Sequence, residues 1–262
     1  MDRQQTTTAL PRRVRNPLHF RLASVSNKVL IANAFWRIEL TGDELKGFIS
    51  EGFDDHIRVF FPEQSSRKIT IPVVTDEGVI WPEGPRSPAR DYTPLFFDSE
   101  KGRLTIDFFR HPYGIASQWA ENAAIGDQLV VGGPRGSLLV PETYQSQLYF
   151  CDETGLPALK RRLSSGIASR GTFYLWCEPE LAKNYLELPA EAEVFYFSPQ
   201  KMDVGQISSL CSELEKRALS GDDYFVWITG ESEAVKGLSD YFTVTRQCEE
   251  ARIRAVAYWH KK

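Results

Sequence analysis

The sequence has no long apolar run, and this absence excludes the simplest kinds of membrane protein. No segment reaches the ~18 apolar residues that a membrane-spanning helix needs. The pair Arg12-Arg13 is not followed by the apolar stretch of a secretory signal. We therefore expect a protein that stays in the cytoplasm. With 42% hydrophobic and 25% charged residues, the composition is that of a globular protein with a substantial core.

Cysteine and histidine are scarce and scattered. The four cysteines lie 26, 34 and 37 residues apart, which matches neither a CxxC metal clip nor a dense disulfide framework. The four histidines show no pair at the helical spacing of a zinc site. We interpret the cysteines as buried thiols and expect no protein-bound metal.

Basic residues form no dense patch. The formal net charge is −4, so the chain has no overall positive field to attract a polyanion. We therefore expect no nucleic-acid partner.

The first half of the chain is rich in strand patterns. Expected strands cover residues 22–31, 35–40, 57–61, 92–97 and 104–109. Apolar residues alternate with polar ones at Leu104, Ile106 and Phe108, and residues 98–102 are a hairpin turn signal. Five prolines between Pro62 and Ala89 indicate a long ordered excursion between barrel strands. Residues 1–143 are therefore predicted to form an antiparallel β-barrel behind a polar N-terminal tail.

The second half has a different pattern, in which short apolar runs alternate with helical segments. The runs cover residues 148–151, 173–177, 194–197, 224–229 and 253–259. Apolar residues recur at helical spacing from Val204 to Leu214 and from Val235 to Phe242. Residues 144–262 are therefore predicted to form an α/β domain whose mostly parallel sheet is covered on both faces. A barrel followed by such a sheet is a layout of two-domain oxidoreductases.

Five motifs follow one another in the sequence. They are Arg90-Asp-Tyr-Thr93, Asp107-Phe-Phe-Arg-His111, Gly114-Ile-Ala-Ser-Gln-Trp119, Gly133-Pro-Arg-Gly136 and Asp152-Glu-Thr-Gly-Leu-Pro157. In this order and spacing they resemble the siderophore-interacting protein family of the ferredoxin-reductase-like superfamily, and most of all the nicotinamide-using ferric siderophore reductases of the vibriobactin-utilisation type. The resemblance extends from Arg15 to His260 and implies an N-terminal Greek-key barrel that binds FAD and a C-terminal domain that binds NAD(P)H.

The first motif is suited to a flavin. Tyr92 can lie against the flat ring with its hydroxyl in a polar environment. Thr93 can offer its hydroxyl or N–H to the flavin edge, and the planar fork of Arg90 can pair with two diphosphate oxygens. The alternative is a plain strand with a surface arginine.

Gly114 allows a sharp turn before a helix over residues 115–123, whose first turn presents free N–H groups to an anion. Ala116 and Ser117 therefore fit a pyrophosphate cradle, although Ser117 could simply cap the helix and Trp119 could simply pack. His111 could hydrogen-bond the cofactor or be structural. The resemblance adds Phe109 and Arg135, in the second and fourth motifs, to the cofactor-binding residues.

The nicotinamide nucleotide is expected outside the carboxyl ends of the parallel strands. Asp152, Thr154 and Glu231 follow two of these strands. An ordinary helix cap is the alternative for residues 152–154. The family usually has Gly before Asp152 and Ala after Thr154, whereas this chain has Cys151 and Gly155.

The resemblance further implies that the last strand returns toward the flavin, where Trp259 shields the ring until nicotinamide arrives; a core tryptophan is the alternative. Relatives that use ferredoxin commonly carry an additional C-terminal helix, and the chain ends at Lys262 without one. NADPH or NADH is therefore the expected donor, and two one-electron transfers from the flavin are expected to reduce two ferric siderophores.

Arg58 and Arg254 are the predicted docking residues for an anionic, catecholate-type ferric chelate, with surface salt bridges as the alternative. We expect a monomer. The rival functions are a general flavin or ferredoxin reductase and a non-enzymatic carrier of siderophore or flavin.

Overall fold

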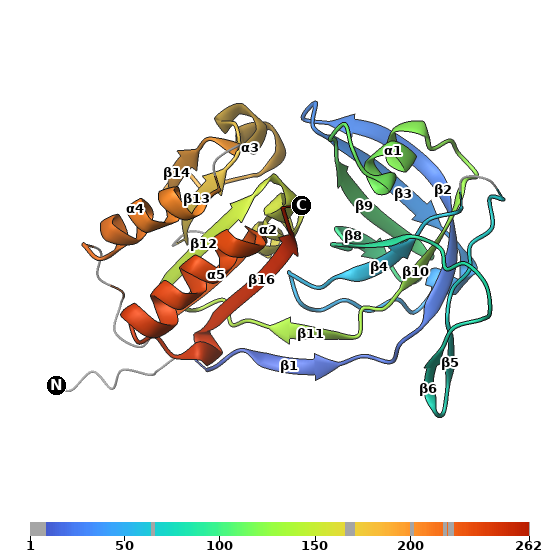
Figure 1. Cartoon of the computed structure of the whole chain (residues 1–262), viewed down its shortest axis with the longest axis horizontal. Coiled ribbons are helices and arrows are strands. Elements are labelled where there is room, and N and C mark those ends of the chain that lie inside the picture. The colour runs from blue at the N-terminus through green and yellow to red at the C-terminus, as the bar shows by residue number, and fades with distance from the viewer. Residues whose placement is uncertain are drawn as a thin grey trace. The chain divides into compact units, whose positions relative to one another are not determined.

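The computed structural model describes residues 9–63, 66–165, 171–199, 202–216, 219 and 223–261, which fall into two compact units (Figure 1). The first unit is Arg13–Leu139. The second begins at Val140 and also includes residues 9–12, where the Tyr144 hydroxyl donates to the Ala9 carbonyl at 2.7 Å. Among the described residues, no helix is both long and apolar enough to cross a membrane.

The first unit is built on an antiparallel sheet with the strand order β7-β4-β10-β2-β3-β9-β8. Two smaller pairings, β1 with β11 and β5 with β6, accompany it. The strands are β1 (Arg12–Arg15), β2 (Phe20–Ile31), β3 (Phe35–Thr41), β4 (Ile57–Phe60), β5 (Val73–Thr75), β6 (Gly78–Ile80), β7 (Ala89–Tyr92), β8 (Phe96–Asp98), β9 (Arg103–Phe109), β10 (Gln128–Gly132) and β11 (Gly136–Leu139).

The barrel core follows from the alternation seen in the sequence. Leu104, Ile106 and Phe108 on β9 are fully buried, and helix α1 (Ile115–Asn122) adds Ala116 and Ala120 to the same core. Residues 98–102 form the predicted hairpin turn between β8 and β9. The Pro62–Ala89 excursion contains the β5–β6 hairpin. A short 3₁₀ turn, η1 (Asp43–Leu45), follows β3.

The prediction of one strand over residues 92–97 is wrong. The run divides into β7 and β8, with a break at residues 93–95. Pro94 lies in this break and has no N–H to donate to a ladder, so the pairing stops there. Thr93 consequently stands just beyond the end of β7.

The second unit has the parallel strand order β14-β13-β12-β15-β16. Its strands are β12 (Ser146–Asp152), β13 (Gly171–Trp176), β14 (Glu193–Phe197), β15 (Tyr224–Glu231) and β16 (Ile253–Trp259). Its helices are α2 (Leu156–Ser164), α3 (Pro179–Tyr185), α4 (Val204–Leu214) and α5 (Ser232–Asp240), with single turns η2 (Glu153–Gly155), η5 (Tyr241–Thr245) and η6 (Glu250–Arg252).

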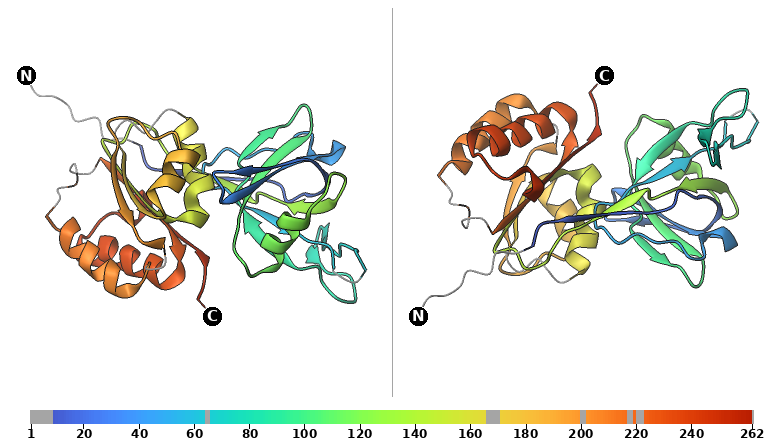
Figure 2. Two further views of the ribbon diagram at one scale, coloured as in Figure 1. Left: turned by 90° about the horizontal axis from the view of Figure 1, so that it is seen from above. Right: turned by 90° about the horizontal axis from the view of Figure 1, so that it is seen from below.

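Both faces of this sheet are covered, as predicted. Helices α4 and α5 pack with Leu148 and Phe150 on one face, and α2 contacts β12 and α3 on the other. Figure 2 shows the orange and red helices on one side of the sheet and the yellow helix on the other. The predicted fold class, an antiparallel barrel followed by a parallel α/β domain, is confirmed.

Candidate functional site

Strand β7 holds the first motif at an edge of the barrel sheet. The half-buried Tyr92 ring lies 4.4 Å from the Phe108 ring, centroid to centroid, at a tilt of 49°. Burial raises the pKa of Tyr92, which the Arg90 guanidinium opposes, so the phenol stays protonated at neutral pH. Arg90 is exposed and donates one hydrogen bond to the Ala89 carbonyl, which leaves most of its fork open.

Thr93 presents a buried polar group at the same place. The residue is 7% exposed, and its hydroxyl has no hydrogen-bond partner among the described residues. The hydroxyl is not among the fully buried side-chain atoms that lack a partner, so it reaches the surface and is open to an external hydrogen-bond partner. The polar edge of a cofactor ring would supply one.

Two neighbouring strands, β7 and β4, each carry an arginine, and a third arginine lies in the turn after the next strand, β10. Arg58 lies on β4, where it stands opposite Asp91 on the neighbouring strand β7 and opposite Gly132 on the other neighbour, β10. The Arg58 Nη1 atom lies 3.1 Å from Asp91 Oδ1, and both side chains are about half exposed. Arg135 follows β10 closely and is also exposed.

A buried carboxylate that the sequence analysis missed supports the turn carrying Arg135. Asp55 Oδ2 accepts hydrogen bonds from the Ser50 hydroxyl (2.8 Å), the Gly52 N–H (3.1 Å) and the Ser137 hydroxyl (2.6 Å). This network joins residues 50–55 to the start of β11. The only signal in the sequence is an aspartate pair directly before a buried strand.

Helix α1 begins at Gly114, whose φ of 106° lies in the region that favours glycine. A Cβ there would meet His111 Cε1 at 2.9 Å. No side chain caps the helix, so the N–H groups of its first turn are available to an anion.

Ser117 is not that cap. Its buried hydroxyl accepts from the His111 N–H at 3.0 Å and donates to the His111 carbonyl at 2.8 Å. Only the backbone of Ser117 can therefore contribute to a phosphate cradle. Partial burial lowers the pKa of His111, so its imidazole is neutral at pH 7.

A hollow of about 650 Å³ opens at the start of α1. It lies between the helix and the proline-rich excursion and is within the size range of ligand pockets. Its lining residues are Glu63, Pro85, Arg86, Pro88, Gly114, Ile115 and Gln118. Nearby, Trp119 packs on Phe61 and Phe108 with centroids 5.6 and 5.9 Å away, and Phe109 lies 5.4 Å from Phe35.

In the second unit, Asp152 lies fully buried at the carboxyl end of β12. Its Oδ1 accepts from the Thr154 N–H at 2.9 Å and from the Thr154 hydroxyl, as the capping interpretation requires. Its Oδ2 accepts from Trp259 Nε1 at 2.6 Å. Burial raises the pKa of Asp152, and the hydrogen bonds from Thr154 and Trp259 oppose this. Trp259 is 37% exposed, so it is not a core tryptophan.

Glu231 ends β15, the next strand in the sheet. Its carboxylate accepts from the N–H groups of Glu233 (2.9 Å), Ala234 (3.3 Å) and Lys261 (3.3 Å). Burial acts to raise the pKa of Glu231, but these hydrogen bonds lower it overall. The carboxylate therefore stays ionised and caps α5.

The same edge of the sheet is acidic. Burial, together with the charges of Asp152 and Glu178, raises the pKa of Glu153 to about 7. Burial and the nearby Glu153 raise the pKa of Cys177 to about 12, so this thiol is protonated at neutral pH. The sequence analysis did not identify Glu153 as a residue with altered protonation.

The two departures from the family pattern, Cys151 and Gly155, lie next to each other in the structure. A Cβ on Gly155 would meet Cys151 Cβ and Thr229 Cγ2 at 2.6 Å each. The larger residue at position 151 thus occupies space that alanine at position 155 would need. Glycine at position 151 would remove the first of these two contacts, whereas the contact with Thr229 would remain.

The predicted docking arginines belong to different units. Arg58 is on β4, whereas Arg254 is on β16 and lies opposite Trp227 across the β15–β16 pair. Arg254 is half-buried.

Comparisons with known proteins agree with this geometry. Residues 24–138 match the siderophore-interacting FAD-binding domain, and residues 144–262 match the siderophore-interacting protein family. A protein of Escherichia coli K12 named NADPH-dependent ferric-chelate reductase is 44% identical over 98% of this chain and 99% of its own length. The chain belongs to the siderophore-interacting protein family. This confirms the resemblance seen in the five motifs.

Other members of the siderophore-interacting protein family are more distant. The ferric vibriobactin reductase of Vibrio cholerae is 26% identical, over 92% of this chain and 89% of that protein. The crystal structure of a siderophore utilisation protein from T. fusca superposes with a TM-score of 0.81 at 29% identity and covers 96% of both chains.

Proposed function

We propose that the protein is an FAD-dependent ferric siderophore reductase that takes electrons from NADPH or NADH and releases ferrous iron in the cytoplasm. The observation that carries the proposal is the full-length relationship to a protein named NADPH-dependent ferric-chelate reductase, combined with a barrel that retains the features a flavin needs. The name of the vibriobactin reductase supports a siderophore as substrate.

The barrel residues fit FAD. Tyr92 offers a half-buried aromatic face, and Thr93 offers a surface-accessible hydroxyl just beyond the end of the same strand. Arg90 and the first-turn N–H groups of α1 suit the diphosphate. Phe109, His111 and Arg135 complete the proposed set. Bound FAD supplies the redox chemistry, accepting two electrons and passing them on singly, while the protein supplies positioning and electrostatics.

The carboxyl edge of the second sheet is the proposed nicotinamide site. Asp152 and Thr154 shape the turn after β12, and Glu231 shapes the one after β15. Trp259 donates to Asp152 and is 37% exposed, and its proposed role is to shield the flavin ring until nicotinamide arrives. These residues bind and orient, and no acid–base pair is required because the reaction moves electrons.

For the ferric substrate, Arg58 and Arg254 are the proposed docking residues. Many ferric catecholates are anionic, so exposed guanidinium groups would attract them. Arg58 is exposed, and its salt bridge with Asp91, whose carboxylate is also half exposed, offsets part of its charge. We propose that the enzyme acts as a monomer.

Steady-state rates distinguish this function from its rivals. The purified protein loaded with FAD should reduce ferric catecholate siderophores with NADPH faster than it reduces free flavin or ferredoxin. Faster reduction of free flavin or ferredoxin would favour a general reductase. Tight binding of ferric siderophore without turnover would favour a carrier.

A further inference from the structure

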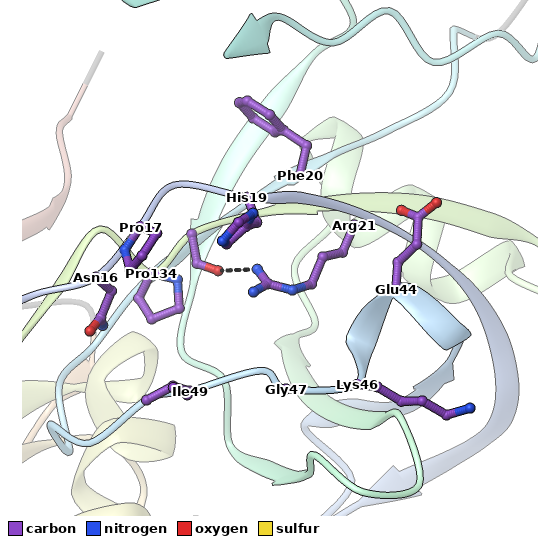
Figure 3. A pocket seen from close by; sticks show the side chains of 11 residues that line it. Asn16, Pro17, His19, Phe20, Arg21, Glu44, Lys46, Gly47, Ile49 and Pro134 are labelled. Atoms are coloured by element: carbon purple, nitrogen blue, oxygen red, sulfur yellow. Dashed lines mark hydrogen bonds between the residues drawn. The ribbon is translucent and has the colours of Figure 1, made fainter. Parts of the chain in front are cut away.

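One cavity of the barrel unit is lined by none of the residues assigned to the proposed reaction. It has a volume of about 420 Å³ and lies between the start of β2, the segment around η1 and the Gly133-Pro134 turn (Figure 3). All of its lining residues belong to the first unit. They are Asn16, Pro17, His19, Phe20, Arg21, Glu44, Lys46, Gly47, Ile49, Gly133 and Pro134.

Arg21 is the buried cation of this cavity. On β2 it faces inward with Ala23 and Val25, and it is only 9% exposed. Its Nη1 atom donates to the Gly133 carbonyl at 3.1 Å, and its guanidinium carbon lies 5.4 Å from the centre of the Phe48 ring. A guanidinium has five N–H donors. Within the described part of the chain, the Gly133 carbonyl is the single hydrogen-bond acceptor of the Arg21 side chain.

The charge of Arg21 is also incompletely balanced. Burial lowers the pKa of Arg21, and the nearby charge of Glu44 opposes this shift. However, Glu44 Oε2 accepts from the Leu22 N–H at 2.6 Å, and no ion pair joins it to Arg21 among the described residues. A buried guanidinium with unmet donors beside a cavity is suited to a carboxylate, which can accept two parallel hydrogen bonds.

The rest of the cavity adds apolar walls and further cations. Pro17, Pro134 and Ile49 offer flat or aliphatic surface. Figure 3 shows the Arg21 side chain pointing from β2 toward the Gly133-Pro134 turn, with Ile49 on a separate segment of the lining. His19 and Lys46 stand at the exposed rim, where Lys46 also pairs with Asp43 at 2.7 Å. The lining therefore combines a buried cation with walls that suit a ring.

We propose that this cavity is a binding site for a small aromatic carboxylate, whose carboxylate pairs with Arg21 and whose ring lies against the proline and isoleucine side chains. None of the proposed cofactor-binding or docking residues is among those that line this cavity. A bound carboxylate would contact Gly133 and Pro134, which line the cavity. The next residue in the chain is Arg135, one of the proposed FAD-binding residues.

Titration calorimetry of the full-length protein with benzoate tests the site without reference to ferric reduction, so it can succeed or fail independently of the proposed function. Benzoate should bind, and benzamide, which has the same shape without the charge, should bind at least about tenfold more weakly. Acetate should also bind more weakly, because it lacks the ring.

Two variants locate the binding. Arg21→Gln removes the cation, and Ile49→Glu places a negative charge at an exposed wall position where folding is not at risk. Each should weaken benzoate binding about tenfold or more, with the melting temperature of Ile49→Glu unchanged. Absence of benzoate binding, equal binding of acetate, or unchanged affinity in Ile49→Glu would each overturn the proposal.

Discussion

Arg58 and Asp91 form an exposed ion pair across β4 and β7, and such pairs contribute little to stability. The charge of Arg58 is thus available for recognition at small structural cost. Asp91 partly screens it, which makes the aspartate a natural control for the arginine. Replacing each residue in turn therefore distinguishes a docking role of the Arg58 charge from a structural role of the ion pair.

Arg58→Glu is expected to raise the KM for an anionic ferric catecholate by roughly threefold or more, because an attractive charge becomes repulsive. Asp91→Asn should lower that KM, and added salt should weaken both effects. Arg254→Glu is predicted to act like Arg58→Glu. The measurement is steady-state reduction of an anionic and a neutral ferric chelate by each variant. Equal losses with both chelates would indicate damage to the fold instead of loss of a docking charge.

Glu153 makes stability depend on pH in a defined window. Its pKa is raised from 4.5 to about 7 in the folded protein. Between these values the folded state binds a proton that the unfolded state has lost, so the free energy of unfolding falls as pH rises through the window. The loss is complete above pH 7, and we expect it to be about 1–3 kcal/mol.

Urea denaturation of the parent and of Glu153→Gln, at pH 5 and pH 8, measures this contribution. The parent should lose more stability than the variant on going to pH 8. Parallel changes in the two proteins would show that Glu153 does not hold the raised pKa.

Strand β7 and the turn after it carry the proposed flavin contacts. Tyr92→Ala should reduce FAD retention because a stacking surface is lost, whereas Tyr92→Phe should retain FAD. Arg90→Ala should also weaken retention through loss of a charged phosphate contact. Flavin content after gel filtration is the measurement, and full occupancy in both alanine variants would exclude this strand as the flavin site.

A core variant controls for folding. Leu104→Ala lies on β9 at a fully buried position and should destabilise the barrel by about 2–5 kcal/mol. Its flavin loss should follow unfolding measured by circular dichroism. Flavin loss from Tyr92→Ala should instead occur at temperatures where that variant is still folded.

The sequence predicted elements whose pattern is local and missed those whose character comes from tertiary contacts. The parallel strands were visible because they are near-continuous apolar runs. The sequence pattern did not predict helix α2, because an arginine such as Arg162 is normally expected on the surface and not on the buried face of a helix. In the structure Arg162 is buried and donates to the Tyr149 hydroxyl and the Val140 and Pro141 carbonyls.

The same limit applies to the candidate site. Residue types and order placed Arg90, Tyr92 and Gly114 in one set, but they did not show that the Ser117 hydroxyl is occupied by the His111 backbone. Nor did they show that Asp55 supports the turn before β11. Such contacts join residues far apart in the chain or depend on a rotamer, and no spacing rule encodes them.

The turn between β12 and α2 tests the paired departure from the family pattern. Gly155→Ala alone should destabilise by about 1–3 kcal/mol, because its Cβ would overlap Cys151 and Thr229. Cys151→Gly with Gly155→Ala should be more stable than the sum of the single changes predicts, with a coupling of about 0.5–3 kcal/mol. Urea denaturation of the four proteins measures it. Strict additivity would mean that the two positions do not share space.

At the scale of the whole molecule, the chain has two units with separate cores. In the proposed function the barrel unit, which matches an FAD-binding domain, holds FAD, and the parallel sheet binds the nicotinamide nucleotide. This division predicts that changes at the Tyr92 end of the barrel affect flavin content, and that changes at Asp152 or Trp259 affect the KM for NADPH. Asp152→Asn should raise that KM while leaving flavin content unchanged.

An anaerobic absorbance titration of the purified protein loaded with FAD tests the central claim most directly. One equivalent of NADPH should bleach the flavin band, and two equivalents of a ferric catecholate siderophore should restore it while ferrous iron appears, because each ferric ion takes one electron. A protein that holds no flavin, or a bleached flavin that the ferric siderophore leaves unchanged, would contradict the proposed function.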